Sequence, residues 1–371
     1  MKILAILERN PGGEYAAARA LLHALEDNDC QIELEELSPL QTTGLFSYFG
    51  WILFSVFRSA KLAAHYKEGR DVYTTTYVAA LGILLLRPFT HQKLSFHYHG
   101  SRIPAPAGRD WPALRKLTQS VKHTVVMQLH RIVFSKTDLL IVPSAKILEQ
   151  LHTEFPTLTD RVALIPNGVD TQFFQPISNA ERQSLRKQYR IPNGSFVCLV
   201  VSRVNAEKGL IESVELVRAI QRFSRHRVLA VFAVPSQGND SQYLHQFLTH
   251  LRSSEVPHLI FEDHQQLNQL YQLSNCVLSC SRREVFPLVL LEAAACGTPY
   301  FAEPNGAIEY YLQQIDPQLV LPQSQQAAAR RVLEETHQNK LSEKLRAFAV
   351  SHTWQASAVR LMQKLEQLTI R

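Results

Sequence analysis

Residues 281–299 read SRREVFPLVLLEAAACGTP, and they carry the clearest helix start and stop signals in the chain. Pro287 suits the first position of a helix, where its missing N–H would be unpaired in any case. Gly297 suits the residue that ends a helix, and Pro299 prevents continuation beyond it. The stretch therefore predicts a short, largely apolar helix over residues 287–296, with unpaired N–H groups in its first turn.

Two acidic residues accompany this helix. Glu284 lies on the loop before it, and Glu292 lies eight residues later in an otherwise apolar segment. An acid in such a segment is seldom fully buried without a partner, because an unpaired charge loses its hydration there. Glu292 could therefore form a structural ion pair, and Glu284 could be an acid favoured by the helix dipole. The alternative for both residues is ligand binding.

Strand and helix patterns alternate on both sides of this stretch. Short apolar or alternating runs predict strands over residues 2–7, 31–37, 93–97, 138–142, 162–165, 196–201, 228–234, 258–261 and 276–278. A change of character at residues 171–195 indicates the connection between domains. This order predicts two successive parallel α/β domains, residues 1–177 and 178–352, with ligands bound beyond the carboxyl ends of the strands.

The composition excludes several other classes of protein. Of 371 residues, 46% are hydrophobic and 19% are charged, which is typical of a folded globular protein and excludes disorder. The net charge of +6 permits an anionic ligand or membrane surface, and no nucleic-acid partner is expected. Five scattered cysteines indicate reduced thiols in a cytoplasmic chain. No apolar run reaches the roughly 18–20 residues of a spanning helix.

A second loop combines two cations with a predicted helix start. It follows the strand at residues 196–201 and reads SRVNAEKG, with Arg203 and Lys208 five positions apart and Gly209 at its end. Two fixed cations beside a helix N-terminus suit a diphosphate, because both favour negative charge. Taken alone, the loop could equally be solvated and carry ordinary surface charges.

Several motifs occur together along the chain. They are the two acids in EVFPLVLLEAAACGTP, the SRVNAEKG loop, IPNGVDTQFF, His99-Gly100, Pro11-Gly12-Gly13-Glu14 and His352-Thr353-Trp354. With this set the chain resembles the retaining glycosyltransferases of family four, and the E-x7-E spacing is the most specific element. The resemblance implies a GT-B fold, in which two Rossmann-like α/β domains face a central cleft. It also implies that a helix at about 353–371 packs back on the first domain.

The resemblance implies a role for each charged residue that matches a motif. Arg203 and Lys208 would neutralise the diphosphate of a nucleotide-sugar. Glu292 would accept hydrogen bonds from the ribose, and Glu284 would bind hydroxyls of the transferred sugar. No metal and no further cofactor would then be required, since fixed cations already stabilise the charge of the leaving diphosphate.

The remaining implied site residues come from both domains. His99 would lie near the sugar, while Gly12 and Gly13 would let the backbone approach the phosphates. The other residues of the implied donor site are Asn167, Phe286, Pro287, Leu288 and Val289. The acceptor would be a glycan or a lipid-linked molecule, and the anomeric configuration of the sugar would be retained.

Three alternatives compete with this interpretation. An NAD(P) dehydrogenase needs a G-x-G-x-x-G turn after its first strand, and Pro11-Gly12-Gly13 does not supply it. Another GT-B enzyme, such as an epimerase or a phosphorylase, shares the fold but fits the E-x7-E segment less well. A catalytically weak GT-B subunit that acts as a partner or scaffold stays open. Turnover of a nucleotide-sugar by the purified chain would distinguish them.

Residues 45–57 suggest a membrane contact at residues 45–70. Ten of these thirteen residues are apolar, and the cations Arg58, Lys61, Lys67 and Arg70 follow. Residues 41–135 contain twelve Lys or Arg against three acids, a local charge of +9. Such a segment suits an interfacial helix on an anionic membrane, peripheral at its inner face. The alternative is a buried helix with a solvated basic face, because periodicity cannot separate the two.

Overall fold

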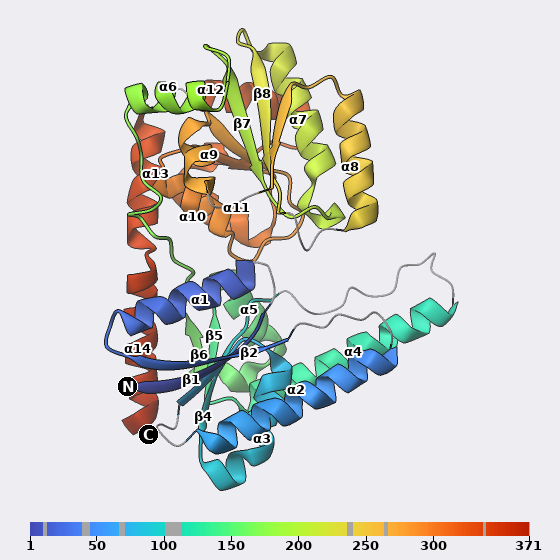
Figure 1. Cartoon of the computed structure of the whole chain (residues 1–371), viewed down its shortest axis with the longest axis vertical. Helices are drawn as coiled ribbons and strands as arrows, with labels where there is room; N and C mark the ends of the chain where they lie inside the picture. The colour runs from blue at the N-terminus through green and yellow to red at the C-terminus, as the bar shows by residue number, and fades with distance from the viewer. Residues whose placement is uncertain are drawn as a thin grey trace. The chain divides into compact units, whose positions relative to one another are not determined.

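The structure is a computed structural model that describes the chain except residues 10–12, 39–44, 67–70, 101–112, 236–239, 263–265, 337–338 and 371. The side chains of residues 45–49, 113–123, 159, 306, 339, 369 and 370 are likewise not described. The chain forms two compact units (Figure 1): unit 1 is Met1–Pro166 with Ser357–Arg371, and unit 2 is Asn167–Ala356. Each unit is built on one parallel sheet.

Unit 1 contains a six-stranded sheet in the order β2-β1-β3-β4-β5-β6. Its strands are β1 (Lys2–Glu8), β2 (Gln31–Leu37), β3 (Asp71–Thr74), β4 (Lys93–His97), β5 (Leu139–Val142) and β6 (Val162–Leu164). All neighbouring strands pair in parallel. The chain order reverses beside β1, so the loops after β1 and β3 diverge at a topological switch point, where α/β sheets bind ligands.

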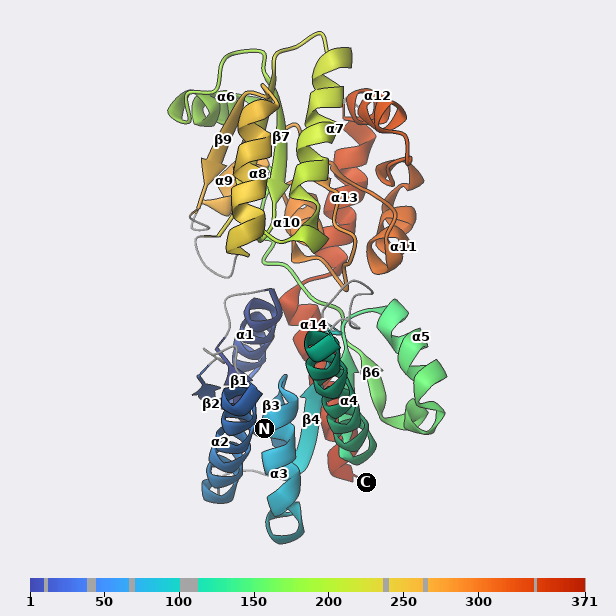
Figure 2. The same ribbon diagram turned by 90° about the vertical axis from the view of Figure 1, so that its right-hand side faces the viewer.

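Helices cover both faces of the unit 1 sheet. They are α1 (Gly13–Glu26), α2 (Leu45–His65), α3 (Tyr77–Thr90), α4 (Ala113–Lys136), α5 (Ala145–Glu154) and α14 (Trp354–Ile370). Right-handed crossovers place α1 on one face and α2, α3 and α4 on the other, and Figure 2 shows the last three side by side. A Cβ atom on Gly82 would lie under 3.0 Å from the Val56 carbonyl oxygen, so α2 and α3 touch at backbone distance.

Unit 2 contains a five-stranded sheet in the order β11-β10-β7-β8-β9. Its strands are β7 (Phe196–Val201), β8 (Val228–Ala233), β9 (His258–Phe261), β10 (Cys276–Ser279) and β11 (Tyr300–Ala302). Every residue of β8 is buried, which explains its continuous apolar sequence. The order reverses between β7 and β10, and this is the switch point of the second sheet.

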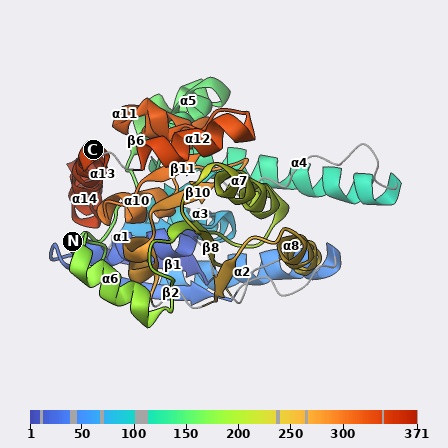
Figure 3. The same ribbon diagram turned by 90° about the horizontal axis from the view of Figure 1, so that it is seen from above.

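The helices of unit 2 also lie on both faces of its sheet. They are α6 (Asn179–Gln188), α7 (Leu210–Phe223), α8 (Ser241–Ser253), α9 (Leu267–Leu273), α10 (Leu288–Ala295), α11 (Gly306–Ile315), α12 (Gln325–Glu335) and α13 (Asn339–Ser351). Figures 1 and 3 show α7 and α8 on one face, with α10 on the other. The buried residues of these elements form one continuous apolar core.

The parallel two-unit architecture is confirmed, but two strands were not expected from the sequence. β3 has four residues and β11 has three, which is too short for a visible alternation of apolar and polar residues. Both are defined by pairing with distant strands: Ile3 of β1 pairs with Asp71, and Val277 of β10 pairs with Tyr300.

The connection between the units also differs from the expected one. The division falls after Pro166 rather than after residue 177. Most of the polar stretch at residues 178–190 is α6, which belongs to unit 2 because Arg186 donates from Nε to the Leu273 carbonyl at 2.8 Å. Charged residues whose polar character suggests a linker therefore hold a helix against the second unit.

The apolar segment at residues 45–57 is the first part of a longer helix. α2 continues to His65, with Ile52, Ser55 and Ser59 among its buried positions. Among the described helices, none combines the length and the apolar character that crossing a membrane requires.

Candidate active site

Two loops of unit 2 meet at the switch point of its sheet. One follows β7 and spans residues 202–209, and the other follows β10 and spans residues 280–287. The Arg282 N–H donates to the Glu207 carbonyl at 2.8 Å, which joins the two backbones directly. The Ser281 hydroxyl donates to the same carbonyl at 3.5 Å. The loops that the sequence singles out separately are thus one continuous structure.

Gly209 makes this junction possible. Its φ of 63° lies in the left-handed region that favours glycine, and it ends the first loop directly before α7. A Cβ atom at this position would lie under 3.0 Å from the Cys280 carbonyl oxygen. Glycine is therefore required here both by backbone conformation and by the close approach of the second loop.

Lys208 and Glu284 form an ion pair across the junction. The Lys208 Nζ lies 2.7 Å from Glu284 Oε1, and the two side chains are only 22% and 16% exposed. The Asn205 side chain accepts from the Lys208 backbone N–H at 3.1 Å and fixes the turn that carries the cation. The ammonium group has three N–H donors, so it can hold Glu284 and still contact an anionic ligand.

The N-terminus of α10 lies at the end of the second loop. Pro287 is the N-cap rather than the first helical residue, a difference of one position, and no side chain caps the helix. Leu288 and Val289 open the helix and are half-buried. Arg203 extends from the first loop and is exposed. A helix terminus without a side-chain acceptor is available to an anion.

Glu292 has a partner that no motif contains. Tyr271 of α9 donates its phenol O–H to Glu292 Oε2 at 2.6 Å. Burial raises the pKa of the Glu292 carboxyl to about 7, while the bond from Tyr271 acts in the opposite direction. Burial and the neighbouring carboxylate raise the pKa of the Tyr271 phenol, so it stays protonated and donates. The partner is thus a phenol, not the cation of a structural ion pair.

Asn167 supports the second loop from the beginning of unit 2. Its Nδ2 donates to the Phe286 carbonyl at 3.3 Å, and its side chain is buried. A Cβ atom on the adjacent Gly168 would lie under 3.0 Å from the backbone of Trp354. The next residue, Val169, donates its N–H to the His352 carbonyl at 2.9 Å. The IPNGVD and HTW motifs are therefore in direct backbone contact.

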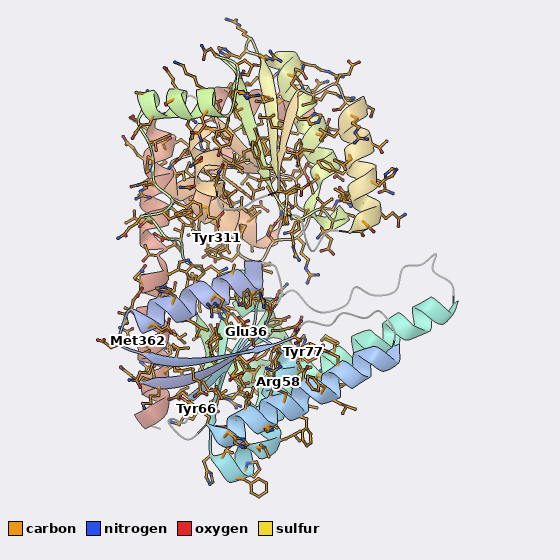
Figure 4. The ribbon with its side chains drawn as sticks, in the orientation of Figure 1. Glu36, Arg58, Tyr66, Tyr77, Tyr311 and Met362 are labelled. Carbon is orange, nitrogen blue, oxygen red and sulfur yellow. The ribbon has the colours of Figure 1, made fainter. Side chains whose placement is uncertain are left out.

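An aromatic cluster surrounds the same segment. The ring of Phe286 lies 4.5 Å from that of Tyr311 on α11, which Figure 4 labels, and 6.2 Å from His352. These centroid distances place Phe286 in packing contact with both neighbours. The Phe286 side chain is therefore held by packing, and its carbonyl accepts from Asn167.

The expected residues of unit 1 lie at the ends of its strands. His99 follows β4 and is buried, with its ring stacked on His97 at a centroid distance of 4.0 Å. The Tyr73 hydroxyl lies 2.7 Å from His97 Nδ1. Burial, then the neighbouring His99, lower the pKa of His97, which is therefore neutral. Gly13 begins α1, whereas Gly12 lies outside the described residues.

Most of the expected donor residues belong to unit 2, and Tyr271, which no motif contains, donates to one of them. Lys208 and Glu284 are in contact, and Asn167 and Phe286 are in contact. Tyr271 was not anticipated, because it lies on the buried face of a short helix without a motif. Its only signal in the sequence was the need for some partner to an acid inside an apolar helix.

The chain consists of two parallel α/β units, and two loops of unit 2 meet at the switch point of its sheet. This architecture is that of the GT-B class. The family model described as Glycosyl transferases group 1 matches residues 181–351, and the model described as Glycosyltransferase Family 4 matches residues 20–173. The chain belongs to the family-four glycosyltransferases.

Curated relatives share part of their length with this chain. D-inositol 3-phosphate glycosyltransferase 1 of Catenulispora acidiphila is 29% identical over 184 residues, which are 48% of this chain and 43% of the relative. The chain spans about half the length of the curated relatives it matches.

Solved structures share the whole fold. Sucrose-phosphate synthase from Thermosynechococcus elongatus superposes with a TM-score of 0.78 at 19% identity, covering 100% of both chains. Anabaena HepE, in complex with UDP and glucose, superposes with a TM-score of 0.72 at 18% identity, covering 99% of this chain and 100% of that one. At these identities the likeness is one of fold.

Proposed function

We propose that this protein transfers a sugar from a nucleoside-diphosphate sugar to an acceptor hydroxyl, with retention of anomeric configuration. The observation that carries the proposal is the partly buried Lys208–Glu284 pair at the switch point, beside the uncapped N-terminus of α10. Anabaena HepE was solved with UDP and glucose, and this supports a donor of the same class here.

The proposed chemistry follows from where charge develops. As the bond between sugar and diphosphate breaks, the leaving diphosphate gains negative charge. Lys208, Arg203 and the N–H groups at the start of α10 stabilise that charge where it appears. Glu292 accepts hydrogen bonds from the ribose, and Glu284 binds the sugar hydroxyls. We therefore propose that no metal ion is needed.

The test is a panel of nucleoside diphosphates and nucleotide-sugars against the full chain. A ligand that binds only the folded state raises the unfolding temperature, and turnover of the same nucleotide-sugar is then measured with and without EDTA. We expect one base to be preferred and turnover to persist in EDTA. Absence of any thermal shift and of any turnover, including hydrolysis, would overturn the proposal and favour a scaffold role.

The two acids should have separable effects. Glu292→Gln should raise the dissociation constant of the nucleoside diphosphate about 5- to 20-fold, because a charged hydrogen-bond acceptor is replaced by a neutral one. Glu284→Gln should instead lower turnover and change the preference among sugars, with diphosphate affinity nearly unchanged. Calorimetric titration and steady-state kinetics check both. Glu334→Gln, an exposed acid of α12, is the control. Equal loss of diphosphate affinity in both variants would show that the roles are wrongly divided.

We further propose that unit 1 docks on an anionic membrane and that the acceptor is lipid-linked. α2 exposes Leu53, Phe54 and Phe57, and Phe57 is 78% exposed. Positions 54, 57 and 61 follow helical spacing, so Lys61 shares the face of the two aromatic residues. Arg58, labelled in Figure 4, lies beside them on α2. Cations next to exposed aromatic side chains favour anionic lipid, by about 1 kcal/mol per cation near the surface.

The other face of α2 is occupied by packing within unit 1. Ser55, Ser59 and Ala63 are buried, and the backbone of α2 contacts Gly82 of α3. The Trp51 indole N–H donates to the Ser38 carbonyl at 3.0 Å, so this side chain already stabilises the fold of unit 1. α3 adds exposed Leu85 and Phe89. The exposed aromatic residues of α2 are therefore the better probes of membrane contact.

The double variant Phe54→Ser with Phe57→Ser should bind phosphatidylglycerol vesicles about tenfold or more weakly than the wild type, because two aromatic side chains no longer enter the interface. Co-sedimentation at low and high salt measures this, and neutral vesicles should bind neither protein. Val350→Ser, an exposed apolar residue of α13, should change nothing. Absence of wild-type binding to the anionic vesicles would leave a non-membrane acceptor, and equal binding of wild type and double variant would show that this face of α2 is not the docking surface.

A further inference from the structure

We propose that Tyr271 is a positioning residue of the donor site, whose phenol O–H fixes the Glu292 carboxylate in the orientation that receives the ribose hydroxyls. The inference rests on the proposed nucleotide-sugar activity and adds to it a residue outside every motif. Tyr271 acts through Glu292 and does not touch the substrate itself.

The position of Tyr271 is fixed from several sides. Its side chain is fully buried in α9. Its carbonyl accepts from the Thr298 hydroxyl at 2.9 Å, which anchors its backbone to the segment after α10. Its ring lies 5.8 Å from that of Phe174. A ring held in this way fixes the position of its phenol oxygen, which lies 2.6 Å from Glu292 Oε2.

The two oxygens of Glu292 have different surroundings. Oε2 is held by Tyr271, whereas no described residue donates a hydrogen bond to Oε1. The Glu292 side chain as a whole is half-buried. A carboxylate has room for further donors. In the proposed arrangement one oxygen fixes the orientation of the carboxylate, and the other receives the ribose hydroxyls.

The charge of Glu292 depends on the same bond. Tyr271 faces the carboxyl from α9. The Cys296 thiol lies at the end of α10, where burial and then Glu292 raise the pKa of this thiol and Arg346 of α13 lowers it. Burial and Glu292 raise the pKa of the Tyr271 phenol, and Tyr300 of β11 contributes in the same direction. Burial raises the pKa of Glu292 to about 7, and donation by Tyr271 is the interaction that lowers it. Loss of the phenol O–H therefore favours the protonated acid at neutral pH.

A purely structural bond between α9 and α10 would behave differently. It would change the stability of unit 2 and leave the pH dependence of nucleotide binding alone. A positioning bond instead shifts the pH at which affinity is lost, because an ionised carboxylate accepts stronger hydrogen bonds than a protonated one. The pH profile of binding therefore separates the two roles.

The experiment measures UDP, ADP and GDP affinity of the full chain from pH 6 to 9. In the wild type, affinity should fall as the pH drops through about 7. Tyr271→Phe removes one oxygen and keeps the ring, and it should move this midpoint up by about one pH unit. The dissociation constant should then rise about fivefold at pH 7 and less than about twofold at pH 9. Titration of the nucleotide itself is common to all variants and cancels in the comparison.

Three further proteins make the assignment specific. Tyr189→Phe also removes a phenol O–H bonded to α9, here to Gln269 at 2.7 Å, and should leave affinity and profile unchanged. In a Glu292→Gln background, Tyr271→Phe should no longer shift any midpoint. 3-Fluorotyrosine at position 271 has nearly the same shape but is a stronger hydrogen-bond donor, so it should lower the midpoint. This protein tests the inference even if Tyr271→Phe is unstable.

Each outcome is decisive. An unshifted profile in Tyr271→Phe and in the fluorotyrosine protein, with normal nucleotide binding by the wild type, would overturn this inference and leave the proposed function intact. An equal loss of affinity at pH 7 and pH 9 would show that the phenol is only structural. A wild type that binds none of the three nucleotides at any pH would overturn the proposed function and this inference with it.

Discussion

Lys208→Ala should slow nucleotide-sugar turnover about 30- to 1,000-fold, because the loss of one charge-assisted contact to a leaving diphosphate costs about 2–4 kcal/mol of transition-state stabilisation. Arg203→Ala should have the smaller effect of the two, since its guanidinium is exposed to solvent, which screens its charge. Steady-state kinetics with the preferred nucleotide-sugar provide the measurement.

The ion pair adds a second signature to the Lys208 variant. Removal of Lys208 leaves Glu284 partly buried without its cation, so the unfolding temperature should also fall slightly. Lys187→Ala, an exposed residue of α6, controls for the general loss of a positive charge. Wild-type kinetics in both Lys208→Ala and Arg203→Ala would refute the assignment of these residues to the diphosphate.

Gly209→Ala should destabilise unit 2 by about 2–6 kcal/mol, as the sum of a left-handed backbone for a residue with a side chain and a clash with the Cys280 carbonyl. Turnover of the surviving folded protein should fall as well, because separation of the two loops moves Lys208 away from Glu284. Thermal or denaturant unfolding gives the first quantity, and kinetics per folded molecule gives the second.

Gly194→Ala is a matched control within the same unit. Gly194 also has a positive φ, of 72°, but a Cβ atom there would meet nothing within 4 Å. Its replacement should therefore cost only the conformational part, about 1–2 kcal/mol. The difference between the two variants isolates the contact between the loops. If both lose the same stability, the close approach at Cys280 does not contribute.

Most of the fold could be predicted from the sequence because buried parallel strands are continuous apolar runs. β7 and β8 are clear examples, since nearly every position in them is buried. β3 and β11 escaped prediction because a strand of three or four residues has no internal pattern and depends on its partner strands. Pairing between strands that are distant in the chain cannot be predicted from a short segment of sequence.

The candidate site was only partly predictable. Lys208 and Glu284 could be identified by motif, but their direct pairing depends on how two adjacent strands end, which no spacing reveals. Asn167 could be identified, whereas its bond to the Phe286 carbonyl depends on the tertiary fold. Tyr271 could not be predicted, since a tyrosine on the buried face of a short helix resembles any other core residue in the sequence.

The discontinuity of unit 1 has a consequence for biosynthesis. Unit 2 is one uninterrupted stretch, whereas unit 1 needs Ser357–Arg371, which the ribosome makes only after unit 2 is finished. In this segment Ser357 donates its hydroxyl to the Pro166 carbonyl at 2.6 Å, and the Leu368 carbonyl accepts from Lys93. The first unit therefore stays incomplete until α14 has been synthesised, while the second unit can already fold. In a chain that stalls at this stage, the surface that α14 normally covers would be exposed and available to chaperones.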